Sequence, residues 1–250
     1  MKALITGASS GMGREFARLL KNKGYDVILV ARREDRLNAL AKELGGAQVI
    51  ATDLCSAEAC FNLYEQVKSQ NIDILINNAG FGIYGRFDST PLEKELSLID
   101  VNVRAVHILT KLFLPDLVKK DSGYIMNVAS LAGLMPGGPL LSSYYASKAY
   151  VRSLTLSVAE ELAHKKSRVK ICALCPGPVK TEFDAVAGVG NSLDGLDSRK
   201  VAEYALDRMF KGQKIIVPGF IMKCSRFFSR LMPDSLLCKI AYGVQQKKGE

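Results

Sequence analysis

Several protein classes are excluded by what this 250-residue sequence lacks. No apolar run is long enough to cross a bilayer as a helix, and no internal repeat, linker or low-complexity segment divides the chain. The first apolar strand begins almost at Met1, so we expect no secretory leader. With 48% hydrophobic residues and a mean hydropathy near zero, the sequence predicts one globular, cytoplasmic domain with a large core.

Cysteine and histidine patterns typical of disulfide or metal proteins are also missing. Cys172 and Cys175 form a CxxC, but they fall in an expected strand, where residues three apart point to opposite faces. His107 and His164 have no matching carboxylate or nucleophile pattern around them. We therefore expect reduced thiols, two structural or exposed histidines, and no metal site.

Strand and helix patterns alternate along the chain, and the strands are almost continuously apolar, as in Val27–Ala31. This is typical of a parallel sheet covered on both faces. Thr90 and Glu93 fit a capping box with Pro91 at the first helical position, Ser198 fits another N-cap, and Pro115 should kink or end its helix. The expected strands are about 2–6, 25–31, 47–52, 72–77, 123–129, 168–174 and 214–217. The expected helices are about 12–23, 34–44, 57–69, 91–119, 143–164 and 199–211.

A glycine-rich turn joins the first strand to the first helix. Lys2–Thr6 runs directly into Gly7-Ala-Ser-Ser-Gly-Met-Gly13. Glycines at such a junction let the backbone approach a pyrophosphate, and the N–H groups and dipole of the helix stabilise its charge. The sequence therefore predicts a dinucleotide phosphate site at this turn.

Tyr144 and Lys148 are four residues apart in an expected helix, so both side chains leave one face. Two opposite charges about 4–5 Å apart interact by roughly 3–4 kcal/mol at an effective dielectric near 20. Such an interaction would lower the pKa of the Tyr144 phenol by roughly 2–3 units from its usual value near 10. The pair could then exchange a proton with a carbonyl or alcohol oxygen near neutral pH.

With these motifs in order, residues 1 to about 218 resemble the short-chain dehydrogenase/reductase family, in its compact single-domain branch. The resemblance rests on the glycine turn, Asn77-Asn-Ala-Gly80, Val101-Asn-Val103, Ser130 with Tyr144 and Lys148, and Pro176–Thr181. Ser130 and Tyr144 are fourteen residues apart, where thirteen is usual, and we place the extra residue in the Pro136–Pro139 loop. The resemblance implies a Rossmann-like, doubly wound fold with a seven-stranded parallel sheet and helices on both faces. We expect residues 219–250 to be a helical extension of that domain.

The resemblance also implies the site residues. The implied catalytic residues are Asn102, Ser130, Tyr144 and Lys148, with Lys148 connected to bulk protons through Asn102 and a water. Tyr144 and Lys148 also contact the cofactor, and the other implied cofactor residues are Gly7, Ser9, Ser10, Gly11, Met12, Gly13, Arg32, Asp53, Leu54, Asn78, Ala79, Gly80, Pro176, Gly177, Val179 and Thr181.

The end of the second strand indicates which cofactor is preferred. Members that prefer NAD carry an acidic residue there, which binds the ribose hydroxyls. This chain has Ala31 followed by Arg32 and Arg33, and a guanidinium can bind a 2′-phosphate. We therefore predict NADPH (NADP) rather than NAD. Asp53 and Leu54 are placed to contact the adenine, although Asp53 also fits a helix N-cap.

Substrate identity is less constrained by the sequence. The candidate wall residues are mainly apolar, and segment 185–196 is glycine-rich like a lid. The first interpretation is therefore an enzyme that interconverts a small or hydrophobic (lipid- or steroid-like) ketone and its alcohol, as a homodimer or homotetramer. The alternatives are a reductase of carrier-bound 3-ketoacyl chains, a cofactor-binding redox sensor with little turnover, and a membrane-peripheral scaffold. The wall residues are Phe81, Tyr84, Leu131, Met135 and Phe183.

The C-terminal tail holds most of the chain's excess positive charge. Residues 211–250 carry eight Lys or Arg and two acidic residues, a net +6 out of +9 for the chain. Residues 219–232 predict an amphipathic helix with an apolar stripe from Phe220 to Leu231, and a second helix follows Pro233. We expect these helices to pack on the domain or across a dimer. The alternative is contact with anionic lipid or an acidic carrier protein; no recognised nucleic-acid module accompanies the charge.

Overall fold

Seven parallel strands form one sheet in the order β3-β2-β1-β4-β5-β6-β7. The computed structural model describes residues 1–189, 195–229 and 231–249. The predicted doubly wound sheet is confirmed, because strand order reverses direction after β1. The strands are β1 (Lys2–Thr6), β2 (Asp26–Ala31), β3 (Gln48–Ala51), β4 (Ile74–Asn77), β5 (Tyr124–Val128), β6 (Lys170–Leu174) and β7 (Ile215–Ile216).

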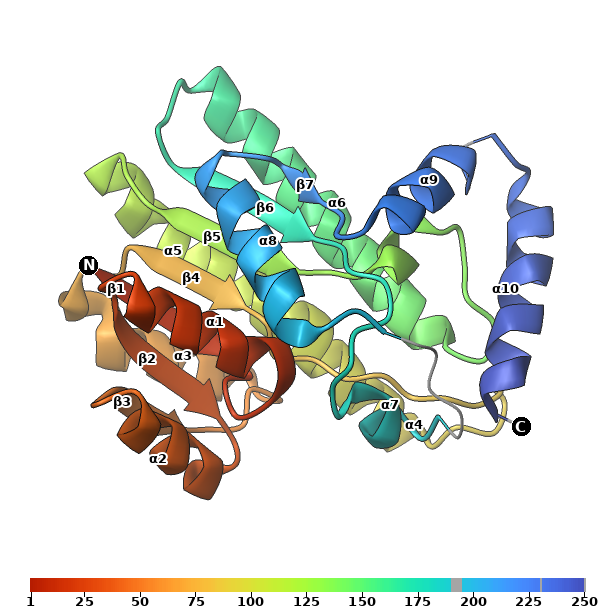
Figure 1. Cartoon of the computed structure of the whole chain (residues 1–250), viewed down its shortest axis with the longest axis horizontal. Coiled ribbons are helices and arrows are strands. Elements are labelled where there is room, and N and C mark those ends of the chain that lie inside the picture. The colour runs from red at the N-terminus through yellow and green to blue at the C-terminus, as the bar shows by residue number, and fades with distance from the viewer. Residues whose placement is uncertain (190–194, 230, 250) are drawn as a thin grey trace.

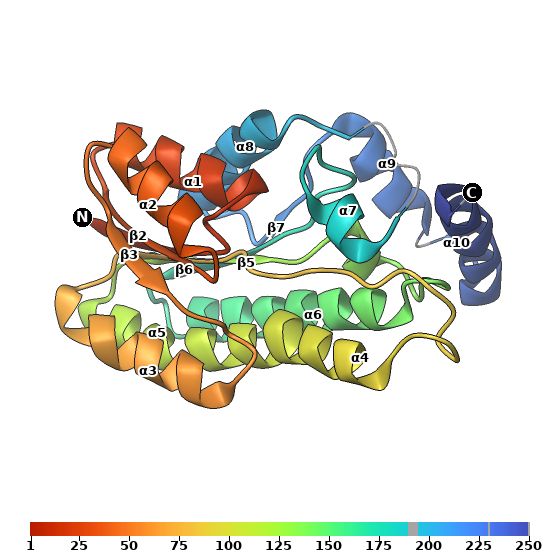
Figure 2. The same ribbon diagram turned by 90° about the horizontal axis from the view of Figure 1, so that it is seen from below.

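Helices cover both faces of the sheet (Figures 1 and 2). One face carries α1 (Gly11–Asn22), α2 (Glu34–Glu43) and α8 (Ser198–Phe210), and the other carries α3 (Ala57–Val67), α4 (Leu92–Ile99), α5 (Val106–Lys120) and α6 (Ser142–His164). The shorter helices are the 3₁₀ segments η1 (Lys68–Gln70) and η3 (Leu131–Leu134), the π segment η2 (Asp100–Ala105) and α7 (Phe183–Ala187). The tail forms α9 (Phe220–Ser229) and α10 (Asp234–Gly249).

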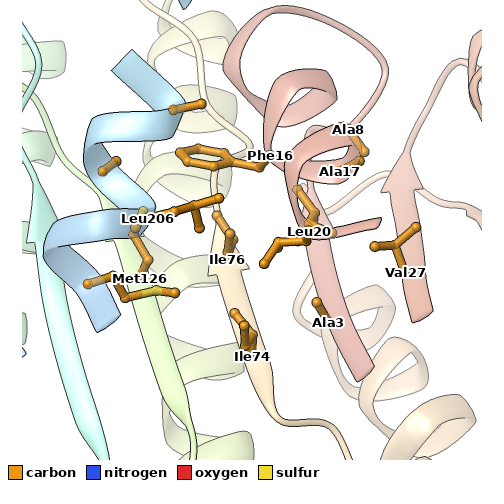
Figure 3. Close-up of a cluster of buried hydrophobic side chains, with 14 of the residues drawn as sticks. Ala3, Ala8, Phe16, Ala17, Leu20, Val27, Ile74, Ile76, Met126 and Leu206 are labelled. Atoms are coloured by element: carbon orange, nitrogen blue, oxygen red, sulfur yellow. The ribbon is translucent and has the colours of Figure 1, made fainter. Parts of the chain in front are cut away.

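The cores on the two faces explain why the strands are apolar at successive positions. Phe16 of α1 and Leu206 of α8 pack on Ile76 of β4 in one core (Figure 3), whereas Leu4 of β1 and Phe113 of α5 belong to the other. Side chains alternate between faces along a strand, so a sheet buried on both sides needs apolar residues at every position. These side chains are almost fully buried.

Two predicted helix caps are wrong, and of the two effects predicted for Pro115, a kink or an end to its helix, the end does not occur. Thr90 makes no capping box, because its hydroxyl donates to Glu95 Oε1 (2.8 Å) and α4 begins after Pro91. Asp197, rather than Ser198, caps α8 by accepting a hydrogen bond from Lys200 N (2.9 Å). Pro115 does not end its helix, since α5 continues to Lys120.

The predicted helix at 91–119 is continuous but not uniform. It consists of α4, the π segment η2 and then α5. A π segment inserts one extra residue per turn, and such segments are frequent at functional sites. Periodicity alone could not reveal it, because the apolar pattern on both sides remains helical.

The two tail helices form as predicted, but most of the apolar stripe of α9 does not pack against the other residues that the structure describes. The side chains of Phe220, Phe227 and Phe228 are exposed by 79%, 63% and 56%. The opposite side of α9 faces the domain, where Ser229 is buried and Met222 packs against Val217 and its neighbours. In the described ranges, no helix is both long and apolar enough to cross a membrane.

Candidate active site

A cavity of about 610 Å³ opens at the carboxyl ends of the central strands. The glycine turn follows β1, Asn78–Gly80 follows β4, Ser130 follows β5 and Pro176–Val179 follows β6, and all four segments line this cavity. In open α/β sheets, ligands bind at this edge, where the strand order reverses. The helices α6, α9 and α10 close the other side of the cavity.

The glycine turn is a tight connection whose helix N-terminus has no side-chain cap. Gly7 and Gly11 have φ values of +67° and +50°, which favour glycine. A Cβ atom at Gly13 would overlap the Gly7 carbonyl oxygen and lie 2.6 Å from Asn78 Nδ2. The Ser10 side chain makes no cap hydrogen bond. The first N–H groups of α1 are therefore free of a side-chain cap, which suits the negative charge of a phosphate.

Hydrogen bonds from the end of β1 fix the neighbouring loop after β4. Thr6 Oγ1 accepts from the backbone N–H groups of Asn78 and Ala79, each at 3.0 Å. In return, the Asn78 side chain donates to the carbonyl oxygens of Thr6 (3.0 Å) and Gly7 (3.3 Å). The two loops that would contact a dinucleotide are thus held together by four bonds.

Asn102 lies at the centre of the π segment and is fully buried. Its Nδ2 donates to the carbonyl oxygen of Phe81 (2.9 Å) and to Ser147 Oγ (3.1 Å), and its Oδ1 accepts from Phe81 N (3.0 Å). It therefore connects α6 to the loop that begins the substrate side of the cavity. A Cβ atom at Gly80 would lie 2.8 Å from Asn102 Oδ1 and 3.2 Å from Lys148 Nζ, so Gly80 separates these two groups.

The side chains of Ser130, Tyr144 and Lys148 meet inside the cavity. Ser130 caps η3 by accepting from Ala132 N (3.1 Å) and also hydrogen-bonds the Tyr144 phenol. Lys148 is only 4% exposed; its Nζ donates to Val128 O (2.8 Å) and lies 5.8 Å from the centroid of the Tyr144 ring. The extra residue between Ser130 and Tyr144 does not prevent this convergence.

The protonation of this pair differs from the prediction. Burial raises the pKa of Tyr144 to about 12, while the hydrogen bond with Ser130 acts in the opposite direction. Burial also lowers the pKa of Lys148 to about 8. Burial disfavours the charged form of each group, so both shifts run against the predicted acidic phenol.

Two arginines lie at the end of β2, and they have different partners. Arg32 is exposed, with Nη1 3.7 Å from Asp53 Oδ2. Arg33 bends over the glycine turn, where its Nε and Nη2 lie 3.3 and 3.2 Å from Ser9 Oγ. Arg33 Nη1 also donates to Glu182 (2.8 Å), and this bond lowers the pKa of the Glu182 carboxyl. Both arginines line the cavity.

Almost all the predicted site residues line this one cavity. The exceptions are Gly13 of the cofactor set, which packs behind the turn, and Asn102 of the catalytic set, which is buried beside the cavity. Phe81, Leu131, Met135 and Phe183 lie in the wall as predicted, whereas Tyr84 does not line it. Tyr84 instead donates from its hydroxyl to Gln245 O (3.1 Å). The predicted lid at 185–196 is described only in part, because residues 190–194 lie outside the described ranges.

Several lining residues were missed by sequence reasoning. Met222 and Ser225 of α9 and Val244 and Gln245 of α10 belong to the wall. They lie 74 to 97 positions from Lys148 on the chain, and the apolar pattern of the tail indicated the other face of α9. Only Tyr145 had a local signal, because it neighbours Tyr144 in a helix that faces the cavity.

Comparison with known proteins agrees with this geometry. The family model described as short chain dehydrogenase matches residues 1–189. An uncharacterised oxidoreductase of Staphylococcus saprophyticus is 34% identical over 215 residues, covering 82% of this chain and 91% of that protein. Oxidoreductase UcpA of Salmonella typhimurium is 36% identical over 200 residues, covering 77% and 74%.

Two solved structures have closely similar folds. A short-chain dehydrogenase from Sphingobium yanoikuyae in complex with NADPH has a TM-score of 0.83 and 29% identity, covering 92% of this chain and 93% of that one. A bulky-bulky ketone specific alcohol dehydrogenase from Comamonas testosteroni has a TM-score of 0.79 and 25% identity, covering 92% and 91%. Together with the family match, these likenesses show that the chain belongs to the short-chain dehydrogenase/reductase family and is an NAD(P)-dependent oxidoreductase.

Proposed function

We propose that this oxidoreductase uses NADPH to interconvert a hydrophobic ketone and its secondary alcohol, with Tyr144 as the general acid and base. The observation that carries the proposal is the convergence of Ser130, Tyr144 and Lys148 in a cavity whose far end is the glycine turn. A site that only bound cofactor would not need a phenol and an ammonium one helical turn apart, which argues against the redox-sensor alternative.

The residues present fit a dinucleotide. The uncapped N-terminus of α1 and the turn Gly7–Gly13 suit its pyrophosphate, and we expect Asp53 and Leu54, which line the same cavity, to contact the adenine. Lys148 and the segment Pro176–Thr181 would hold the nicotinamide end. When bound, the cofactor supplies a hydride to the carbonyl carbon. Arg32 and Arg33 support NADPH, because both guanidinium groups line the cavity at the end of β2, Arg33 beside Ser9, and such groups suit a 2′-phosphate.

Tyr144 and its neighbours handle the proton. As the carbonyl oxygen gains negative charge, the Tyr144 phenol gives it a proton, and Ser130 holds the oxygen by a hydrogen bond. Positive charge on Lys148 favours the phenolate that remains, and Asn102 lies on the route through which we propose that the proton is replaced. In the reverse direction, the phenolate takes the proton of the alcohol. Burial raises the pKa of Tyr144, so the phenol is protonated near neutral pH, as a proton donor must be before the reaction.

The cavity wall supports a hydrophobic substrate. The Phe183 ring lies 5.1 Å from the Tyr144 ring, and Leu131, Met135 and Met222 surround the same space. An apolar wall of this kind excludes strongly hydrated substrates because it cannot replace their hydrogen bonds. The preference of the Comamonas relative for bulky ketones supports the same class. A carrier-bound 3-ketoacyl chain is the second candidate, supported by the basic tail at the cavity.

We also propose that the chain acts as a homodimer or homotetramer. Leu92, Leu96 and Ile99 are exposed along α4. A row of large apolar side chains on one helix is typical of a subunit contact. Size-exclusion chromatography with light scattering would test this assembly.

The function is tested by a screen of NADPH oxidation over four classes: small ketones, bulky bicyclic or steroid-like ketones, sugars and 3-ketoacyl thioesters. We expect turnover with bulky ketones above the others, and none with Tyr144→Phe. Turnover restricted to carrier-bound thioesters would favour the second candidate. Failure of every class, with NADPH still bound, would contradict the proposed enzyme.

A further inference from the structure

The outer face of α9 exposes several large apolar side chains whose position the proposed reaction does not explain. Phe220, Ile221, Phe227 and Phe228 are each more than half exposed, as is Leu231 just beyond the helix. Both views place α9 and α10 together at one end of the molecule (Figures 1 and 2). Five large apolar side chains within twelve residues form a continuous patch on one helical face, and such a patch usually marks a contact.

The charge of this segment indicates what the patch contacts. Helix α9 carries Lys223 and Arg226 and no acidic residue, and residues 220–249 hold six basic residues against one acid, Asp234. The Lys223 side chain is exposed at the edge of the patch, with Nζ 5.4 Å from the centre of the Tyr204 ring. A second copy of this chain would bring the same positive charge against itself across a two-fold axis. An anionic surface would be attracted instead.

We propose that α9 docks this protein on an anionic phospholipid surface, with its aromatic face among the acyl chains and Lys223 at the headgroups. A short helix with a bulky apolar face flanked by basic residues has the composition of an interfacial helix. The inner side of α9 presents Met222 and Ser225 to the cavity. The docked helix therefore lies between the lipid surface and the substrate site.

Vesicle sedimentation tests the proposal with the full-length protein. We expect pelleting with phosphatidylcholine vesicles that contain phosphatidylglycerol, and little with phosphatidylcholine alone. The double variant Phe227→Ser/Phe228→Ser should abolish pelleting. Phe61→Ser/Phe87→Ser removes two exposed phenylalanines elsewhere and should pellet like the wild type. Lys223→Gln should weaken binding by about fivefold, the effect of one cationic residue near an anionic surface.

Two results would overturn the proposal. One is that the wild-type protein does not pellet with anionic vesicles. If Phe227→Ser/Phe228→Ser then also forms a smaller oligomer than the wild type, a second copy of the chain covers the patch. The other is equal pelleting of both double variants. Near-ultraviolet circular dichroism and NADPH binding would show that each variant is folded, so a loss of pelleting could not arise from misfolding.

A separate observation concerns Gln245 of α10, which is 5% exposed and lines the cavity. Its Nε2 donates to the Tyr145 hydroxyl (2.8 Å), and its backbone carbonyl accepts from the Tyr84 hydroxyl (3.1 Å). These bonds fix the residue from two directions. Its Oε1 atom is buried and has no hydrogen-bond partner among the described residues. A buried acceptor without a partner is rare in folded proteins and needs an explanation.

We infer that Gln245 Oε1 accepts a hydrogen bond from a hydroxyl group of the substrate, remote from the reacting carbonyl. The inference rests on the proposed ketone reduction and narrows its substrate to hydrophobic ketones that carry a second, hydroxylated position. Tyr145 acts as a positioning residue, because its bond to Nε2 fixes the orientation of the Gln245 amide. A site built to bind a hydroxyl discriminates strongly against the analogue that lacks it.

The test compares two steroid-like ketones that differ only in one remote hydroxyl. Wild-type enzyme should prefer the hydroxylated ketone in kcat/KM, mostly through KM. Gln245→Met, which keeps the volume but removes the acceptor, should lose about 5- to 100-fold on that ketone and little on its deoxy partner. The expected loss follows from the cost of an unpaired buried polar group.

The Gln245 assignment would be overturned if Gln245→Met lost kcat/KM equally on both ketones, or if the wild type did not prefer the hydroxylated ketone. Reduction of the deoxy ketone by the wild type and by Gln245→Met would show that the proposed reductase function survives that result. Absence of reduction with either ketone across hydroxyl positions would instead count against the proposed function itself. Gln245→Glu, which keeps acceptor atoms, should retain the preference for the hydroxylated ketone.

Discussion

Lys148 carries its charge in one of the most buried positions of the protein, and its ionisation should be visible in stability. Its pKa is lowered from 10.5 to about 8 because burial disfavours the ammonium. Between these values the unfolded chain binds a proton that the folded protein does not. By linkage, stability must rise with pH over this window, and below about pH 8 the penalty is constant.

We therefore predict that Lys148→Met removes a pH-dependent part of stability. The wild type should gain up to about 3 kcal/mol relative to the variant as pH rises from about 7.5 to about 10, the equivalent of a shift of more than two units. Urea unfolding at several pH values measures this difference. If the free energy of unfolding changed with pH in the same way for both proteins, the result would contradict a buried Lys148 with a lowered pKa.

Cofactor selection at the end of β2 also depends on single residues. Arg32→Ala should weaken the binding of NADPH by more than about 1.5 kcal/mol, the lower range for a hydrogen bond to a charged group. The binding of NADH should be nearly unaffected. Fluorescence titration measures the dissociation constants of both cofactors. Arg36→Ala is the control, because Arg36 pairs with Glu182 (2.6 Å) but does not line the cavity. Equal losses for the two cofactors would show that Arg32 does not contact the 2′-phosphate.

Among the secondary-structure elements, the junction of β1 and α1 tolerates the least change. A methyl group at Gly13 would overlap the backbone of Gly7 and crowd the Asn78 side chain, so the turn would have to open. We predict that Gly13→Ala no longer binds either cofactor and that its folded state is less stable by about 2 kcal/mol or more. Differential scanning fluorimetry with and without NADPH measures both effects.

Gly243 provides the opposite case for comparison. It lies inside α10 with nothing within 4 Å of an added Cβ, so Gly243→Ala should leave cofactor binding intact. Because alanine favours a helix over glycine by up to about 1 kcal/mol, the variant should be slightly more stable. If Gly13→Ala and Gly243→Ala lost similar amounts of stability and cofactor binding, the result would contradict the tight glycine turn.

The sequence predicted most of these elements because their signals are local. The strand runs, the glycine turn and the Tyr144–Lys148 spacing each depend on residues close together in the chain. The π segment around Asn102 and the cap at Asp197 depend on competition between adjacent hydrogen-bond partners, which the apolar pattern does not show. The pKa of Tyr144 was predicted in the wrong direction, because the sequence did not indicate how deeply the pair is buried.

At the level of the whole chain, the tail is the part whose position was hardest to predict. Its helices were predicted, but the apolar side of α9 faces outward while Met222, Val244 and Gln245 close the cavity. Long-range contacts of this kind have no counterpart in local spacing. The division of the chain into residues 1–218 and an extension at 219–250 stays a prediction.

Deletion of residues 219–250 should therefore affect the substrate more than the cofactor. We predict that the truncated protein binds NADPH with little change but has a raised KM for bulky ketones, because part of the apolar wall is removed. Steady-state kinetics with a small and a bulky ketone separate the two effects. Unchanged KM for both ketones would show that the tail takes no part in the substrate site.

The transfer of deuterium from NADPH labelled at nicotinamide C4 to the alcohol carbon tests the central claim most directly, with mass spectrometry of the product from a bulky ketone. With a ketone that has no remote hydroxyl, we predict labelled alcohol from the wild type and from Tyr145→Phe. Tyr144→Phe should form it at least about a hundredfold more slowly, the usual contribution of a general acid, with nearly unchanged NADPH affinity. Fast labelling by Tyr144→Phe, or loss of labelling in Tyr145→Phe alone, would contradict the assignment of Tyr144 as the proton donor.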